Sequence, residues 1–245
     1  MRLEILGCRL DELDAVAATD RILEFAQRRA AAHVVTLGTE MIVYAQRDPE
    51  FKSIINQSAL SLCDTIGLLL VARLRGSRLR ERVAGVELIE DICQDAARLG
   101  LPIFLLGGTE GVAASAAAEL RKRYLALQIA GEHHGYFTDE ESDAIVKQIA
   151  SSGAAILFAG LGFPRQEFWL ARYLAATRCG AGLGIGGSFD VLSGKVKRAP
   201  GVWQRLGLEW FYRLVSEPHR WRRQLALPQF VWLVLTDSLR RRAST

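Results

Sequence analysis

Two apolar runs that stop at glycines limit the fold of this chain more than any other feature of its sequence. They span Ala155 to Leu161 and Ala181 to Ile185, and they reach the glycine-rich corners Gly160–Gly162 and Gly184–Gly187. A short, continuous apolar run is typical of a strand that is buried on both faces, as the strands of parallel sheets are. Polar residues follow both corners, so polar groups gather where strands end and helices begin. Because ligands bind at that edge of an open α/β sheet, we expect the functional site there.

Similar runs occur upstream and alternate with helical patterns about every 25–30 residues, which is the spacing of βα units. In addition to the two strands above, we predict strands over residues 33–37, 60–64, 102–106 and 128–131. The predicted fold class is therefore α/β, with a Rossmann-like parallel sheet of about six strands flanked by helices. Before this sheet, Met1 to Cys8 is expected to form an edge strand or one arm of a hairpin, and Asp11 to Ala32 a helix.

Charge divides the chain into two parts. Residues 195–245 contain 11 Lys or Arg and 3 Asp or Glu, whereas residues 1–194 contain 20 basic and 24 acidic side chains. We therefore predict an α/β core over residues 1–194 and a basic, helical C-terminal appendage over residues 195–245. A basic segment on a mildly acidic body suggests an anionic partner, which on this ground alone is a nucleic acid, an anionic lipid or a phosphorylated substrate.

Cysteine spacing and hydropathy disfavour several classes of protein. The four cysteines are far apart and form no Cys-x-x-Cys or Cys/His cluster, so we expect buried free thiols and no zinc site. His133 and His134 have no third metal ligand at a diagnostic spacing. The N-terminus lacks the apolar core of a signal peptide, and no apolar run reaches the roughly 20 residues of a membrane-spanning helix. The sequence contains no P-loop, no Gly-x-Ser-x-Gly elbow and no Asp-x-Asp pair.

Asp64 is the leading candidate for chemistry. It follows the largely apolar predicted strand Leu60 to Cys63, and a carboxylate at the end of an α/β strand faces the expected ligand crevice. It could be a general base or the N-cap of the helix that follows, and the sequence supports both interpretations equally. Thr36, one residue before the end of its strand, is more simply a core threonine. Gly107 and Gly108 lead from a strand into a helix, where backbone N–H groups could hold a phosphate, although a tight turn explains them too.

The appendage mixes arginines with aromatic side chains. Between Leu208 and Arg223 it carries Arg213 and Arg220 close to Trp, Phe and Tyr residues. Arginine binds phosphate through two parallel hydrogen bonds, and Trp and Tyr favour the membrane interface. A segment that binds phosphate and membrane is therefore favoured slightly over a solvated helix with ordinary core aromatics.

The order of short motifs along the chain resembles that of the WecG/TagA/CpsF family of glycosyltransferases. The similarity covers roughly residues 33–225. Its motifs are Val34–Glu40, Cys63–Gly67, Arg82–Gly85, Leu105–Gly108, Gly135–Phe137, Gly160–Glu167, Gly186–Asp190, Arg198–Pro200 and Glu209–Arg220. A chance match of so many motifs in one order is not expected.

The resemblance implies an inverting glycosyltransferase of cell-surface polysaccharide biosynthesis. Such an enzyme moves a sugar, N-acetylmannosamine or a related hexose, from a UDP-sugar to a polyprenyl-diphosphate-linked sugar, without an obligatory metal or another cofactor. The resemblance implies that Asp64 is the catalytic base and that Thr36 helps to place the reacting sugar. It implies donor or nucleotide binding for Arg82, Gly107, Gly108, Gly135, Tyr136, Gln166, Gly187 and Asp190. It implies binding of the acceptor diphosphate for Arg213, Arg220 and Arg223.

The resemblance also implies where such an enzyme works. We expect it in the cytoplasm, peripherally associated with the inner face of the cell membrane. The resemblance leaves a homo-oligomer open and implies no nucleic-acid partner. The implied chemistry agrees with the residues, because one carboxylate can deprotonate the acceptor hydroxyl while arginines and helix N-termini stabilise the departing diphosphate.

Two positions depart from the usual pattern of the family. Gly38 stands where the family commonly has Asn, and Cys63-Asp64-Thr65 stands where it has Ala-Asp-Gly. Both lie beside the expected sugar pocket, and a missing amide side chain is compatible with another donor, such as UDP-glucose. The alternative function is a non-catalytic nucleotide- or nucleic-acid-binding α/β module that uses the basic tail. A third hypothesis is an α/β enzyme that uses another nucleotide.

Overall fold

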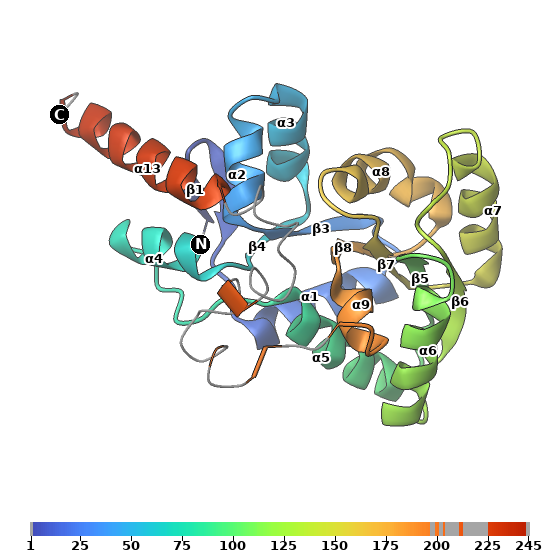
Figure 1. The fold of residues 1–245 in the computed structure, drawn as a ribbon. Helices are drawn as coiled ribbons and strands as arrows, with labels where there is room; N and C mark the ends of the chain where they lie inside the picture. Colours follow the sequence, from blue (N-terminus) through green and yellow to red (C-terminus); the bar gives the residue numbers. More distant parts are fainter. Residues whose placement is uncertain (1, 197–198, 201–202, 204–210, 213–224, 244–245) are drawn as a thin grey trace.

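A parallel sheet of six strands lies at the centre of the protein and confirms the predicted fold class. The structure is a computed structural model that describes residues 2–196, 199–200, 203, 211–212 and 225–243. The strands lie in the order β4-β3-β8-β7-β5-β6, and every adjacent pair is parallel (Figure 1). They are β3 (Ala32–Leu37), β4 (Leu60–Cys63), β5 (Ile103–Gly107), β6 (Ile129–His133), β7 (Ile156–Gly160) and β8 (Ala181–Gly184).

Helices cover both faces of this sheet, because alternate residues of each strand point to opposite faces. In β5, for example, Ile103 and Leu105 belong to one apolar core, whereas Phe104 and Leu106 belong to another. One face is covered by α1 (Ala15–Gln27), α5 (Gly85–Leu99), α6 (Val112–Arg123) and α9 (Ser188–Leu192). The other face is covered by α2 (Thr39–Ala45), α3 (Pro49–Gln57), α7 (Ser142–Ser152), α8 (Arg165–Tyr173) and the 3-10 turn η1 (Leu174–Thr177).

Two further helices, α4 (Ile66–Leu74) and α13 (Ala226–Ala243), project from the same end of the molecule (Figure 1). α13 is attached to the body, because Phe230 is buried in the core that surrounds α2 and Asp237 forms an ion pair of 2.6 Å with Arg75. Most described residues of the C-terminal segment are thus helical. Its status as a separate basic appendage and its boundary at residue 195 stay predictions. The arginines at positions 213, 220 and 223 lie outside the described residues.

The N-terminal region corrects two predictions. β1 (Arg2–Ile5) and β2 (Cys8–Asp11) form an antiparallel hairpin, so the expected hairpin arm is present. The helix expected from Asp11 begins instead at Ala15, because the carboxylate of Asp14 accepts the N–H of Ala17 at 2.9 Å and caps it there. That helix ends at Gln27 rather than at Ala32.

The helix α3 was not predicted, although Asp48 and Pro49 form an ordinary helix start.

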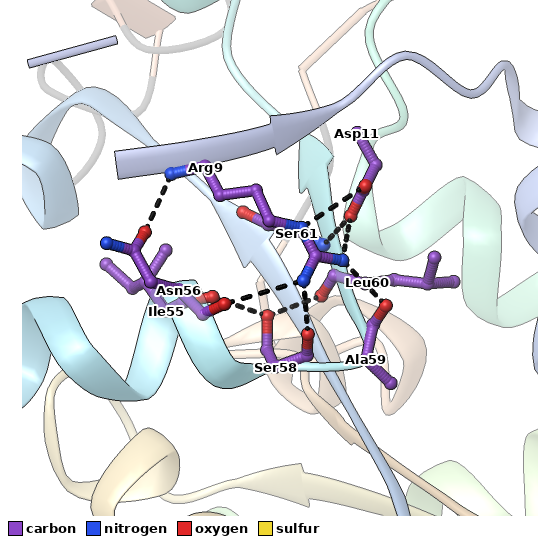
Figure 2. Close-up of polar contacts among 8 residues, drawn as sticks. All are labelled: Arg9, Asp11, Ile55, Asn56, Ser58, Ala59, Leu60 and Ser61. Atoms are coloured by element: carbon purple, nitrogen blue, oxygen red, sulfur yellow. Dashed lines mark hydrogen bonds and ion pairs between the residues drawn. The ribbon is translucent and has the colours of Figure 1, made fainter. Parts of the chain in front are cut away.

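The hairpin is fixed to the sheet edge by the side chains of Arg9 and Asp11 (Figure 2). The Arg9 guanidinium donates to the Asp11 carboxylate at 2.7 Å and to the carbonyls of Ser58 and Ala59 at 2.9 and 2.8 Å. Asp11 in turn accepts the N–H of Ser61 at 2.9 Å. Ser61 lies in β4, an edge strand, so the carboxylate satisfies a backbone donor that no neighbouring strand can reach. This network supports the strand that leads to Asp64.

Candidate active site

A cleft of about 1090 Å³ lies at the carboxyl ends of the parallel strands. It is lined by the segments that follow all six strands, because parallel strands bring their carboxyl ends to one edge of the sheet. Most of the predicted site residues meet there. They are Thr36, Asp64, Arg82, Gly108, Gly135, Tyr136, Gln166, Gly187 and Asp190.

Asp64 lies at the end of β4 and is half-buried. Its Oδ1 accepts the N–H of Gly85, the first residue of α5, at 3.1 Å. The carboxylate therefore binds the N-terminus of α5, and the N-cap position of α4 is taken by Thr65. A helix N-terminus carries partial positive charge and stabilises a carboxylate in its ionised form. An ionised carboxylate that lines a cleft is able to accept a proton from a ligand hydroxyl.

Thr36 lines the same cleft from the neighbouring strand. Its hydroxyl donates to the carbonyl oxygen of Gly184 in β8 at 2.9 Å. Because the hydroxyl proton is used within the protein, this oxygen offers a ligand an acceptor and not a donor. The residue is thus both a tie between β3 and β8 and part of the cleft wall.

Gln166 is held in one orientation by two hydrogen bonds. Its Oε1 accepts the N–H of Gly186 at 2.9 Å, and its Nε2 donates to Oε1 of Glu167 at 2.7 Å. Glu167 is only 1% exposed, and its Oε2 has no hydrogen-bond partner among the described residues. Burial raises the pKa of Glu167 to about 8, while the hydrogen bond from Gln166 opposes this shift. Glu167 is therefore largely a neutral acid at pH 7.

Gly184 makes this arrangement sterically feasible. A Cβ atom at Gly184 would lie 2.6 Å from Nε2 of Gln166 and 2.9 Å from Oε1 of Glu167. Any side chain at position 184 would therefore displace the Gln166 amide from its place in the cleft wall. The glycine at the end of β8 thus leaves space for the side chains of Gln166 and Glu167, in addition to allowing the turn that follows.

Gly107 and Gly108 have backbone roles. A Cβ atom at Gly107 would lie 2.4 Å from the carbonyl oxygen of Gly160, and φ of Gly107 is +147°, so only glycine fits between β5 and β7. Gly108, which lines the cleft, donates its N–H to the Gly160 carbonyl at 3.1 Å and accepts the N–H of Gly135 at 2.8 Å. The Gly108 amide is thus used inside the protein, and close packing accounts for both glycines.

Charged groups of both signs line the cleft. Among the described residues the cations are Arg82, Arg165 and Lys195, and the carboxylates are Glu40, Asp64 and Asp190. Lys195 Nζ lies 3.1 Å from Oγ1 of Thr109 and 3.8 Å from Asp190, so it bridges the segments after β5 and β8. Sequence reasoning did not assign a role to Lys195, although it begins the basic segment.

Arg165 is a second residue to which sequence reasoning gave no role. Its guanidinium donates to the carbonyls of Gly135 and Phe137 at 2.5 and 2.7 Å and lies 4.4 Å from the centre of the Phe137 ring. These contacts hold the Gly135–Phe137 segment against the start of α8. The exposed Tyr136 is presented to the cleft by a segment that Arg165 fixes at both ends.

Comparison with known proteins identifies the family of this chain. The family model described as "Glycosyl transferase WecG/TagA/CpsF family" matches residues 3–244. The chain belongs to the WecG/TagA/CpsF family of glycosyltransferases. Similar relatives include the N-acetylglucosaminyldiphosphoundecaprenol N-acetyl-beta-D-mannosaminyltransferases of Bacillus spizizenii (strain W23) and Bacillus subtilis (strain 168). Each is 34% identical, over 86% and 87% of this chain and 81% and 82% of the relative, respectively.

The two unusual positions of this glycosyltransferase face each other. A Cβ atom at Gly38 would lie 3.4 Å from the methyl group of Thr65, which is an ordinary contact. The Thr65 hydroxyl is buried and has no hydrogen-bond partner in the described part of the chain. Both residues line the cleft beside Asp64. The wall that meets a ligand here therefore differs in shape and polarity from one that has Asn and Gly at these positions.

Three other sequence expectations can be compared with the structure. All four cysteines are free and buried, as predicted. His133 Nδ1 contacts the carbonyl oxygen of His134 at 2.8 Å, and the described residues include no group of three or more side chains suited to hold a metal ion. Across the described ranges, no helix is both long enough and apolar enough to cross a bilayer.

Proposed function

We propose that this glycosyltransferase moves N-acetylmannosamine, or a related hexose, from a UDP-sugar to a polyprenyl-diphosphate-linked sugar with inversion. The observation that carries the proposal is the position of Asp64, a carboxylate held by the α5 N-terminus in the wall of a cleft that also presents Gln166 and Arg82. The names of the two relatives, which describe a mannosaminyl transfer to a diphosphoundecaprenol-linked sugar, support it.

In the proposed reaction Asp64 is the general base. Its carboxylate takes the proton of the acceptor hydroxyl, and the acceptor oxygen forms a bond to the anomeric carbon of the donor sugar. The bond from that carbon to the UDP oxygen breaks, and UDP leaves with the electron pair. Attack on the face opposite to UDP inverts the anomeric centre. Thr36, on the adjacent strand, is proposed to position the donor sugar through its acceptor oxygen.

Leaving UDP carries negative charge that the protein must stabilise. Arg82 and Lys195 line the cleft, and we propose that they contact the diphosphate. Three carboxylates line the same cleft, so the described residues supply little net positive charge. We therefore propose that Arg213, Arg220 and Arg223 complete the site for the acceptor diphosphate and that no metal ion is obligatory. Because the acceptor is a membrane lipid, the proposed place of work is the inner face of the cell membrane.

The proposal is tested by a transfer assay with defined substrates. Purified protein is incubated with UDP-N-acetylmannosamine, UDP-N-acetylglucosamine or UDP-glucose and with an N-acetylglucosamine-diphosphoryl-prenyl acceptor, with and without EDTA. We expect one donor to be used, EDTA to leave the rate unchanged, and NMR to show an inverted anomeric centre. No transfer and no UDP binding, together with salt-dependent binding to nucleic acid, would replace the proposal with a non-catalytic nucleic-acid-binding module.

A further inference from the structure

The cleft changes character along its length. At the strand ends its wall includes charged and polar side chains, but between α4 and α13 the described lining residues are apolar side chains and one glycine. We call this part the trough and define it by Leu70 and Leu74 of α4 and Val231, Val234 and Leu235 of α13. Sequence reasoning did not find it, because the two helices are far apart in the chain.

The trough is built from two facing stripes. Leu70 and Leu74 lie one turn apart on α4, and Val231 and Leu235 lie one turn apart on α13, so each pair occupies one face of its helix. These side chains are exposed despite their size: Leu74 is 86% exposed, Leu235 56%, Leu70 53% and Val231 49%. A contiguous set of exposed large apolar side chains marks a binding surface more often than scattered single ones do.

The spacing of the two stripes is set by contacts outside the trough. Near its inner end, Gly67 of α4 lies beside Leu227 of α13, because a Cβ atom at Gly67 would make an ordinary contact of 3.4 Å with a methyl group of Leu227. Farther out, the Arg75–Asp237 ion pair joins the segment after α4 to α13, and Phe230 anchors α13 in the core. α13 is thus attached by other side chains while its apolar stripe stays open.

We propose that the trough holds the first isoprene units of the acceptor's polyprenyl chain. This inference rests on the proposed function, because it assigns the lipid end of the same acceptor. One continuous cleft has a polar end with Asp64 and Arg82 and an apolar end between α4 and α13. This order matches a ligand whose sugar and diphosphate are joined to a hydrocarbon chain. Removing isoprene methyl and methylene groups from water between the two stripes stabilises such a complex.

The experiment compares two acceptors that differ only in their chain. N-acetylglucosamine diphosphate is supplied as its ethyl ester or as its farnesyl ester, below the concentration at which the latter forms micelles and without vesicles or detergent. We expect the wild-type protein to use both and to have a higher kcat/KM for the farnesyl ester. Leu74→Ser and Leu235→Ser should each lower the ratio of the two kcat/KM values by about tenfold, through KM, because each replaces apolar contact area with a hydroxyl.

Two matched variants serve as controls. Leu125→Ser alters a 92% exposed leucine between α6 and β6, and Trp232→Ser alters a 69% exposed side chain of α13 that does not line the cleft. Both should retain the wild-type ratio. Melting temperatures of all variants identify any that fail to fold, and Leu70→Asn then replaces a failed trough variant.

Each alternative result overturns the inference in a recognisable way. Equal kcat/KM values for both acceptors in the wild-type protein, or trough variants that keep the wild-type ratio, would show that the chain lies elsewhere. If the trough variants instead lose only their binding to vesicles, the trough contacts the bilayer; if they lose only a dimer in gel filtration, it contacts a second copy. Absence of transfer to the ethyl ester as well as to the farnesyl ester by the wild-type protein would refute the proposed function itself.

Discussion

Glu167→Gln should change how the stability of this protein depends on pH. Glu167 is buried, it accepts a hydrogen bond from Gln166, and burial raises its pKa from the ordinary 4.5 to about 8. Below pH 4.5 both the folded and the unfolded chain carry the proton. As the pH rises from 4.5 to 8, the unfolded chain releases the proton while the folded chain retains it, so the contribution of Glu167 to stability is lost over this window.

The size of the effect follows from the two pKa values. One pKa unit corresponds to about 1.4 kcal/mol, so between pH 5 and pH 7 the wild-type protein should lose about 2.5 kcal/mol relative to the Gln variant. Glutamine has nearly the same shape and retains an oxygen that can accept from Gln166, but it does not titrate. Any cost of its additional buried N–H groups is the same at every pH. The test is therefore how the difference in the free energy of unfolding between the two proteins changes with pH.

The assay is urea unfolding followed by tryptophan fluorescence at pH 5, 6 and 7. Burial lowers the pKa of His33 to about 4, so that group destabilises the fold as the pH falls from 6.5 toward 4. This term occurs in both proteins and cancels in their difference. Glu40→Gln, which removes a carboxylate that raises the pKa of Glu167, should have a smaller effect in the same direction. A difference in the free energy of unfolding that stays constant from pH 5 to pH 7 would refute a protonated Glu167.

Three further predictions concern the hairpin, the cleft and the C-terminal arginines. Asp11→Asn should cost about 2–3 kcal/mol in urea unfolding, because it breaks a largely buried ion pair and weakens the bond to Ser61, whereas Glu24→Gln, in surface pairs, should cost less than about 1 kcal/mol. Gly184→Ala should weaken UDP binding in calorimetry by at least about tenfold, because its Cβ displaces Gln166, and unchanged affinity would show that Gln166 does not contact the donor. Replacing Arg213, Arg220 and Arg223 together by Ala should raise KM for a lipid acceptor by at least about tenfold while the Kd for UDP is retained; unchanged kinetics would remove these residues from the site.

The sheet could be predicted because its signal is local. A strand that is buried on both faces must be apolar throughout, so an apolar run such as Ile156–Gly160 predicts a buried strand from sequence alone. Once the strands are known to be parallel, their carboxyl ends must meet, and this is why Asp64 and Gln166 could be expected in one cleft. The place of Thr36 in that cleft was implied only by the family resemblance. The missed helix α3 also carried a local signal, the cap formed by Asp48 and Pro49.

The parts that sequence reasoning missed depend on partners far along the chain. Asp is a residue type typical of an N-cap, so sequence spacing pointed to the helix that follows Asp64, but the carboxylate accepts the N–H of Gly85, 21 residues away. Asp11 was assigned to a helix, whereas its partner Ser61 is 50 residues away on an edge strand. The trough arises only when α13 packs near α4. The spacing of apolar residues along one segment predicts whether that segment is a helix or a strand. It does not predict which distant segment packs against it.

The central claim is that Asp64 deprotonates the acceptor, and Asp64→Asn tests it most directly. Asparagine keeps an oxygen that can accept the N–H of Gly85, so the α5 N-terminus should stay in place, but an amide is not a base at neutral pH. Transfer rate and UDP affinity are measured on the same preparation, with Asp190→Asn as a second carboxylate of the cleft for comparison. We predict that Asp64→Asn lowers kcat by at least about a hundredfold while the Kd for UDP changes less than about threefold. A variant that transfers sugar at the wild-type rate would contradict the assignment of Asp64 as the base.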